Sequence, residues 1–189
     1  MLRRLDMCVN HARRVKRYRR VHFEPGMNVI IGPNGTGKST ILRAIADCGH
    51  CRRREEGETH YVILETDTAV PRIRSGHQRS DRVTHMILET RALFSSHGEI
   101  IQTAFSTIRI SRATCLLLDE PETAQDFDHL LALRKAMKRA VDHGAQIICA
   151  THEVLFWEGA HVIELRRGYR DRVIREFCHL KCIDNERRE

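Results

Sequence analysis

The sequence predicts an α/β fold with a mainly parallel β-sheet flanked by helices. Short apolar runs at residues 29–31, 61–64, 115–118 and 146–150 have the length and composition of strands buried inside a parallel sheet. Apolar residues recur at helical spacing in the intervals between several of these runs. Strands that alternate with helices form a parallel sheet because each helix returns the chain to the starting edge.

The other elements follow in chain order. Residues 13–31 are predicted as two strands joined by a Pro-Gly turn at residues 24–27. Further predicted elements are a helix at 38–47, a polar surface connection at 48–57, a loop at 66–81, helices at 83–94, 98–110 and 127–141, and a terminal antiparallel pair of strands at 161–165 and 172–177. Gly144 is expected to close the helix at 127–141.

The composition is that of one soluble globular domain, residues 1–189. The chain is 41% hydrophobic and 30% charged, and no run of 18 apolar residues occurs in it. We therefore expect no membrane span. The N-terminus lacks the apolar segment of a secretory signal, so we expect a cytoplasmic protein whose seven cysteines are thiols.

The net charge of +7 is concentrated at the N-terminus. Residues 1–20 hold eight Lys or Arg and one acidic residue, while the rest of the chain is balanced. Two interpretations remain open: basic residues 13–20 bind nucleic acid, or they protect a solvated edge strand from aggregation. Tyr18 is the only aromatic residue among them, which favours the second interpretation.

A glycine-rich turn links the strand at 29–31 to the next helix and matches the pattern G-x-x-x-x-G-K-[ST]. Glycines let successive N–H groups converge on an anion, and the helix N-terminus adds its dipole. Lys38 supplies positive charge for the β and γ phosphates, and the Ser39 hydroxyl can bind Mg²⁺. A nucleoside triphosphate is thus predicted to bind here. The expected contact residues are Asn34, Gly35, Thr36, Gly37, Lys38, Ser39 and Thr40.

Polar residues also follow two other predicted strands, at the sheet edge where ligands of open α/β folds bind. Asp119 can hold Mg²⁺ through its water shell, and Glu120 can polarise the water that attacks the γ-phosphate. His152 can hydrogen-bond a γ-phosphate oxygen. Glu120, His152 and Lys38 are therefore the candidate catalytic residues.

The segment Ser96-His-Gly-Glu99 contains a capping box at the start of the predicted helix 98–110. With the phosphate loop, Leu118-Asp-Glu-Pro-Glu122 and Ala150-Thr-His152, in this order, the segment resembles the ATP-binding-cassette (ABC) ATPase superfamily. More closely, the chain is similar to small soluble ATPases in the branch of the RecF, SMC and OLD proteins, over nearly its whole length.

The resemblance implies a P-loop ABC-type ATPase domain with an N-terminal antiparallel β portion and a reduced helical region at about residues 66–110. It further implies that Ser96, His97 and Gly98 form a signature that contacts the γ-phosphate bound by the opposite subunit, and that Asp126 is the D-loop aspartate. ATP and Mg²⁺ would be held in a head-to-tail homodimer that is coupled to an unknown protein partner. Gln78 is the candidate glutamine that senses Mg²⁺.

Two other functions remain open beside this one. A nucleotide-gated module for DNA or RNA with slow turnover would use the basic N-terminal residues. A transporter nucleotide-binding subunit is disfavoured, because only about sixty residues separate Lys38 from Gly98 and transporter-type cassettes carry a larger helical insert there.

The cysteines add one metal-site hypothesis. Cys48-x-x-Cys51 and Cys178-His-x-x-Cys182 could supply four ligands to one zinc ion. The two pairs lie far apart in the sequence, so free thiols are the default expectation.

Overall fold

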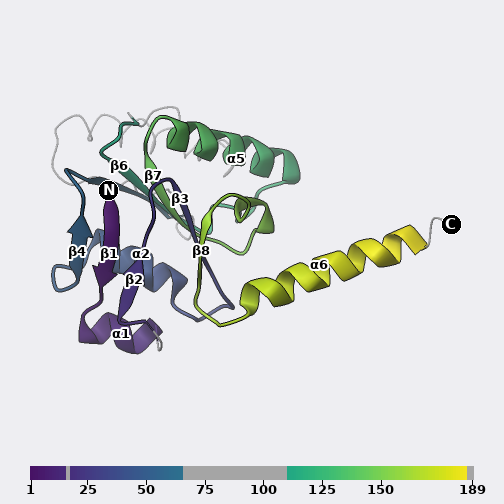
Figure 1. Cartoon of the computed structure of the whole chain (residues 1–189), viewed down its shortest axis with the longest axis horizontal. Helices are drawn as coiled ribbons and strands as arrows, with labels where there is room; N and C mark the ends of the chain where they lie inside the picture. Colours follow the sequence, from purple (N-terminus) through teal and green to yellow (C-terminus); the bar gives the residue numbers. More distant parts are fainter. Residues whose placement is uncertain (16–17, 66–109, 187–189) are drawn as a thin grey trace.

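A computed structural model describes residues 1–15, 18–65 and 110–186 of the chain (Figure 1). A five-stranded parallel sheet with the order β5-β6-β7-β3-β8 forms its centre. The strands are β5 (His60–Glu65), β6 (Thr114–Asp119), β7 (Gln146–Ala150), β3 (Met27–Ile31) and β8 (His161–Glu164). The predicted α/β fold with a mainly parallel sheet is thereby confirmed.

One face of this sheet is covered by helix α5 (Phe127–Asp142), drawn in green in Figure 1. The helix buries Leu130, Leu133, Met137 and Ala140 against alternate residues of the strands, such as Leu116 and Leu118 of β6. Gly144 follows the helix with a φ of 91°, a left-handed conformation that residues with a side chain rarely adopt. The helix therefore ends where the sequence predicted.

The other face carries helix α2 (Lys38–Ala46) and a second sheet, antiparallel, with the order β2-β1-β4. Its strands are β1 (Leu2–Asp6), β2 (Arg20–His22) and β4 (Arg52–Glu55), and helix α1 (Val9–Val15) connects the first two. Leu117 and Ile148 of the central sheet pack against this layer. The parallel sheet is thus sandwiched between α5 and an α2/β layer (Figure 1).

A buried glutamine joins the two sheets. The Gln146 side chain accepts a hydrogen bond from the Leu2 backbone N–H at 2.8 Å and donates to the Leu2 and Glu24 carbonyl oxygens at 2.8 and 2.9 Å. Both the oxygen and the nitrogen of this buried amide are thereby hydrogen-bonded to backbone groups, as buried polar groups usually are. It fixes the first strand of the chain beside the start of β7.

Three sequence predictions are wrong in detail. Residues 13–15 belong to helix α1, and among the described residues of the expected first strand the structure forms a strand at 20–22. Residues 52–55, predicted as a connection, form β4, which pairs with β1. Residues 172–177 are not a strand but lie in helix α6 (Tyr169–Glu186), and β8 pairs in parallel with β3 rather than with them.

Helix α6 extends away from the two sheets (Figure 1). Its sequence has apolar residues at the spacing of a helix, at Val173, Ile174 and Phe177. Most of the side chains described in this helix are exposed. None of the helices in the described parts of the chain has the length and apolar character that a membrane span requires.

Candidate active site

The phosphate loop follows the C-terminal end of β3 and leads directly into α2. Gly37 has a φ of 100°, and a Cβ atom placed there would lie 3.0 Å from Cγ2 of Val15. A side chain at this position would therefore be both strained and crowded. The Thr36 hydroxyl donates to the Pro33 carbonyl oxygen at 2.8 Å, while Asn34 and Gly35 are exposed at the tip. The loop thus has the compact shape that leaves backbone N–H groups available to phosphate.

Lys38 is the most buried charged side chain of the site, with 4% of its surface exposed. Its Nζ atom lies 2.6 Å from His152 Nε2, 3.4 Å from Glu120 Oε1 and 3.5 Å from the Gly32 carbonyl oxygen. His152 Nε2 and Glu120 Oε1 are themselves 3.5 Å apart. The three candidate catalytic residues therefore meet at one point, although their sequence positions span 114 residues.

Ser39 and Asp119 form a second contact beside this point. The Ser39 hydroxyl donates to Asp119 Oδ1 at 2.9 Å. The pair offers a hydroxyl and a carboxylate oxygen next to the phosphate loop, and hard oxygen ligands of this kind suit Mg²⁺. The residues present therefore fit the Mg²⁺ ion that the resemblance implies.

Strand pairing places the acidic residues at the correct sheet edge. Asp119 is paired with Ala150 across β6 and β7, and the Glu120 backbone N–H donates to the Ala150 carbonyl oxygen at 2.8 Å. Glu120 has a φ of 46°, a left-handed conformation that costs a residue with a Cβ about 1–2 kcal/mol. Such strain is retained at sites where a side chain must be aimed. Here it turns the chain sharply at the end of β6.

Glu122 fixes the backbone of His152, a role that the sequence analysis did not assign. Its Oε1 accepts a hydrogen bond from the His152 backbone N–H at 2.6 Å. Burial raises the pKa of this carboxyl above its usual value, while the bond from His152 opposes the shift. The sequence signal was its place in the acidic segment after β6, two residues beyond Glu120.

The pKa of His152 lies below its ordinary value, first because the ring is partly desolvated and second because the Lys38 ammonium is close; Glu120 opposes the shift. The neutral imidazole accepts a hydrogen bond from Lys38, whereas a protonated ring would oppose that cation.

Acidification should therefore destabilise the folded protein through His152. The unfolded histidine binds a proton near pH 6.5, and the folded one only at lower pH. The stabilising contribution is thus complete above pH 6.5 and is lost as the pH falls toward the folded pKa. We expect the His152→Asn variant to lose less stability than the parent between pH 7.5 and 5, as measured by urea unfolding. Identical pH profiles for the two proteins would contradict this.

The other predicted site residues are those expected to form the signature, to sense Mg²⁺ and to belong to the D-loop. Ser96, His97, Gly98 and Gln78, together with the helical region at about 66–110, lie outside the described residues except at residue 110. Asp126 is the N-cap of α5: its side chain accepts hydrogen bonds from the His129 backbone N–H at 2.9 Å, and its Oδ1 lies 2.8 Å from His129 Nδ1. The structure thus gives Asp126 a helix-capping contact within its own chain.

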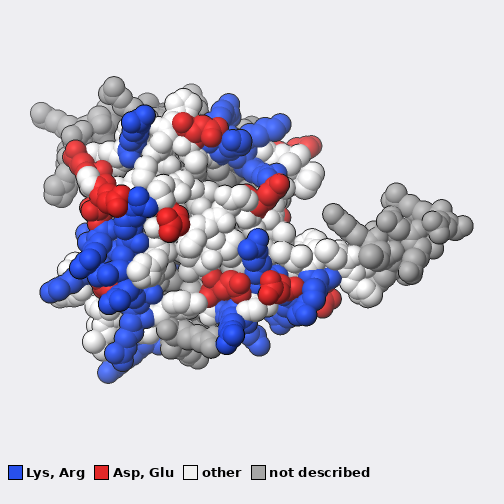
Figure 2. Space-filling model, in the orientation of Figure 1, with Lys and Arg blue, Asp and Glu red and all other residues white. Residues whose placement is uncertain are grey.

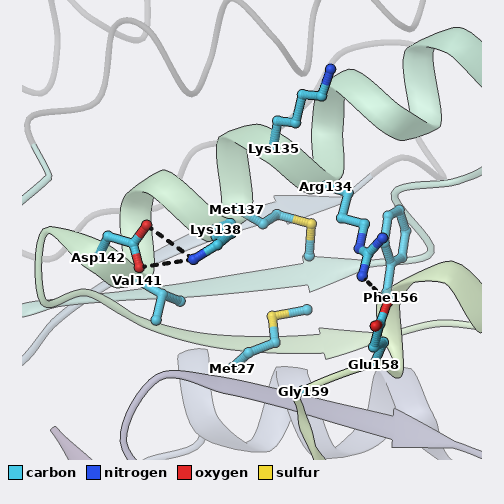
Figure 3. A pocket seen from close by; sticks show the side chains of 10 residues that line it. All are labelled: Met27, Arg134, Lys135, Met137, Lys138, Val141, Asp142, Phe156, Glu158 and Gly159. Atoms are coloured by element: carbon cyan, nitrogen blue, oxygen red, sulfur yellow. Dashed lines mark hydrogen bonds and ion pairs between the residues drawn. The ribbon is translucent and has the colours of Figure 1, made fainter.

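A separate pocket of about 520 Å³ lies away from the phosphate loop (Figure 3). It includes Met27 at the N-terminal end of β3, the edge opposite to the loop, and Met137 of α5. Lys138 pairs with Asp142 at 3.3 Å on its rim, and Arg134 pairs with Glu158. The pocket is therefore distinct from the candidate active site.

The basic residues of the N-terminal segment gather on another surface. Lys and Arg side chains crowd the region of β1, β2 and β4 (Figure 2). A hollow of about 1430 Å³ there is lined by Arg4, Arg13, Arg19, Arg20 and Arg52, among others. Asp6 pairs with Arg4 and with Arg20, each at 2.8 Å, and so offsets part of the positive charge.

Comparison with protein families matches residues 11–136 to the family described as AAA domain (AAA_23). Similar proteins include the cytochrome c biogenesis ATP-binding export protein CcmA of Vibrio vulnificus, 24% identical over 77% of this chain and 88% of that protein. The hemin import ATP-binding protein HmuV of Rhodococcus jostii is 23% identical over 77% of this chain and 60% of that protein.

Two solved structures share the fold. The ATP-binding subunit of an ABC transporter has a TM-score of 0.52 and 20% identity, with 79% of this chain and 78% of that chain covered. The other, named "Putative ABC transporter (ATP-binding protein)" and from Pyrococcus furiosus, has a TM-score of 0.51 and 21% identity, with 77% of this chain and 88% of that chain covered.

Proposed function

Because the chain belongs to the AAA domain family, we propose that Lys38, Glu120 and His152 carry out Mg²⁺-dependent ATP hydrolysis at the edge of its parallel sheet. The family and the fold support ATP binding and hydrolysis by an ABC-type ATPase. The observation that carries the residue assignment is the convergence of Lys38 Nζ, His152 Nε2 and Glu120 Oε1 within 3.5 Å of one another beside the phosphate loop.

The proposed roles follow from the chemistry of each group. Lys38 exchanges its contacts with His152 and Glu120 for phosphate oxygens when ATP binds, since a buried ammonium needs charged or polar partners. Glu120 then orients the attacking water and accepts its proton. His152, whose backbone Glu122 holds, contacts the γ-phosphate.

Ser39 and Asp119 would hold Mg²⁺, Asp119 through the ion's water shell. When bound, the ion neutralises negative charge on the β and γ phosphate oxygens.

We further propose that the site is completed by a second copy of the chain, with Ser96, His97 and Gly98 acting on the ATP of the opposite subunit and Asp126 near the shared interface. What supports this is the order of the motifs in the sequence. In such a head-to-tail homodimer each ATP lies between two chains, so ATP binding closes the dimer and hydrolysis opens it.

A mixing experiment tests the shared site. The Lys38→Ala variant has an intact signature, and a Gly98→Asp variant has an intact phosphate loop, so each alone is expected to be inactive. Mixed in equal amounts, they should recover up to about a quarter of the parental ATPase activity, because half of the dimers are mixed and each contains one complete site. A mixture no more active than its parts would contradict the shared site, but not hydrolysis by Glu120.

Two classes of partner are proposed for the cycle. The names of the relatives, an export and an import ATP-binding protein, favour a transporter partner. The short interval between Lys38 and Gly98 is unlike that of transporter-type cassettes, and the arginine-lined hollow offers a surface for DNA or RNA, as expected for a protein of the RecF, SMC and OLD branch.

Capture of partners by the Glu120→Gln variant in the presence of ATP distinguishes the two classes. A bound integral membrane protein supports the first. Salt-sensitive nucleic acid that is lost on changing Arg19 and Arg20 to glutamine supports the second.

A further inference from the structure

Four potential metal ligands from two distant segments meet beside helices α1 and α2. They are Cys8, His11, Cys48 and Cys51, and their Sγ and Nδ1 or Nε2 atoms all lie within 4.8 Å of one another. We propose that these four side chains bind one Zn²⁺ ion in a structural site of three cysteines and one histidine. Three thiolates with one imidazole are a preferred ligand set of structural zinc.

The distances fit a tetrahedral ion. Bonds of about 2.3 Å to sulfur and about 2.0 Å to nitrogen place neighbouring sulfur atoms about 3.8 Å apart and sulfur about 3.5 Å from nitrogen. In the structure the Sγ atoms of Cys8 and Cys48 are 3.9 Å apart. Nδ1 of His11 lies 3.1 Å from Cys8 Sγ and 3.6 Å from Cys51 Sγ. Little movement is therefore needed to bind the ion.

The surrounding groups favour a metal over a disulfide. The Cys8–Cys48 sulfur separation is nearly twice the length of a disulfide bond, about 2.05 Å, and all the cysteines described are free. The Cys8 backbone N–H donates to Cys51 Sγ at 3.3 Å. Hydrogen bonds from backbone to sulfur are the outer-shell support that metal-bound thiolates receive.

The fold explains how the ligands are assembled. Cys8-x-x-His11 begins at the end of β1, and Cys48-x-x-Cys51 links α2 to β4. β1 and β4 are antiparallel, with Asp6 opposite Arg52, so that the residues just after β1 lie beside those just before β4. The zinc site considered from the sequence, which joined Cys48 and Cys51 to Cys178 and Cys182, is therefore wrong. Cys178 lies in α6, which extends away from α1 and α2 (Figure 1).

The ion would fasten α1 to the phosphate loop. His11 is in α1, whose last residue, Val15, packs against Gly37 at the start of α2. Cys48 lies two residues beyond the other end of α2. Zinc bound at the cluster would therefore hold α1 in place against the phosphate loop. Its loss should make the loop more mobile.

The test is metal analysis of the full-length protein purified without added chelator. We expect about one zinc per chain in the parent and none in Cys48→Ser. Cys178→Ser is the matched control, because this cysteine is exposed and distant from the cluster, and it should retain the metal. His11→Cys preserves four ligands and should also retain it, whereas His11→Ala should weaken zinc binding by more than about 10-fold in competition with a chelating dye.

A second measurement remains decisive if Cys48→Ser does not fold. Co²⁺ added to the zinc-free parent should give the intense visible bands of tetrahedral thiolate coordination, shifted in His11→Cys and weakened in His11→Ala. Zinc removal should also lower the affinity for ATP in the parent and in His11→Cys, both of which hold the ion. A metal-free parent with a Cys8–Cys48 disulfide, copper or iron in place of zinc, or equal zinc in every variant would overturn the proposal.

Discussion

The Glu120→Gln variant should bind ATP normally but hydrolyse it about 10²–10⁴-fold more slowly than the parent, the usual contribution of a general base. Glutamine keeps the shape of the side chain but cannot accept a proton from the attacking water. The substitution also removes a negative charge 3.4 Å from Lys38, so one competitor of the phosphate oxygens for the ammonium is lost. Phosphate release and fluorescent-nucleotide binding measure the two effects separately.

The same variant should accumulate as a dimer in the presence of ATP and Mg²⁺, because the proposed cycle opens the dimer only after hydrolysis. Size-exclusion chromatography with light scattering detects this. Glu122→Gln is the matched control: its carboxyl bonds the His152 backbone rather than facing Lys38, and an amide oxygen can still accept that bond. Turnover of Glu120→Gln at the parental rate would refute the role assigned to Glu120.

The central sheet and the ligand-binding edge of that sheet could be predicted because each strand is marked by residues adjacent to one another in the sequence. The strands that end at Ile31, Asp119 and Ala150 are short apolar runs, and each is followed by residues that suit phosphate or Mg²⁺. Parallel pairing then brings the three ends to one edge. Because β3 and β7 are neighbours in the sheet, the residues that follow them lie close together, and the structure places Lys38 Nζ 2.6 Å from His152 Nε2.

An antiparallel β portion at the N-terminus was expected from the resemblance and is present, but its strands β1 and β4 could not be placed from the sequence because long-range contacts decide them. β4 has four exposed, charged residues and forms only because β1 offers it a partner. β1 is in turn fixed by the Gln146 side chain, 144 residues away. The proposed zinc ligands Cys8 and His11 were missed for the same reason, because the β1–β4 register brings them to Cys48 and Cys51.

Replacing Lys38 with alanine should abolish ATPase activity and weaken ATP binding by at least about 10–100-fold, since a hydrogen bond to a charged group contributes about 1.5–3 kcal/mol. Lys138→Ala is the matched control. That lysine is exposed on α5 and pairs with Asp142, so its removal should leave both quantities unchanged. Calorimetric ATP titration and phosphate release measure the two effects.

Lys38→Ala should also change the titration of His152, which separates loss of the charge from general damage to the loop. The lysine ammonium lowers the pKa of the imidazole, so its removal should raise that pKa and let Glu120, 3.5 Å away, stabilise the protonated ring. The imidazole signal, assigned with His152→Asn, should titrate at higher pH in nuclear magnetic resonance spectra of the nucleotide-free variant. An unchanged titration together with lost ATP binding would mean that Lys38 does not face His152 in solution, and that the three-residue contact is not the resting state of the site.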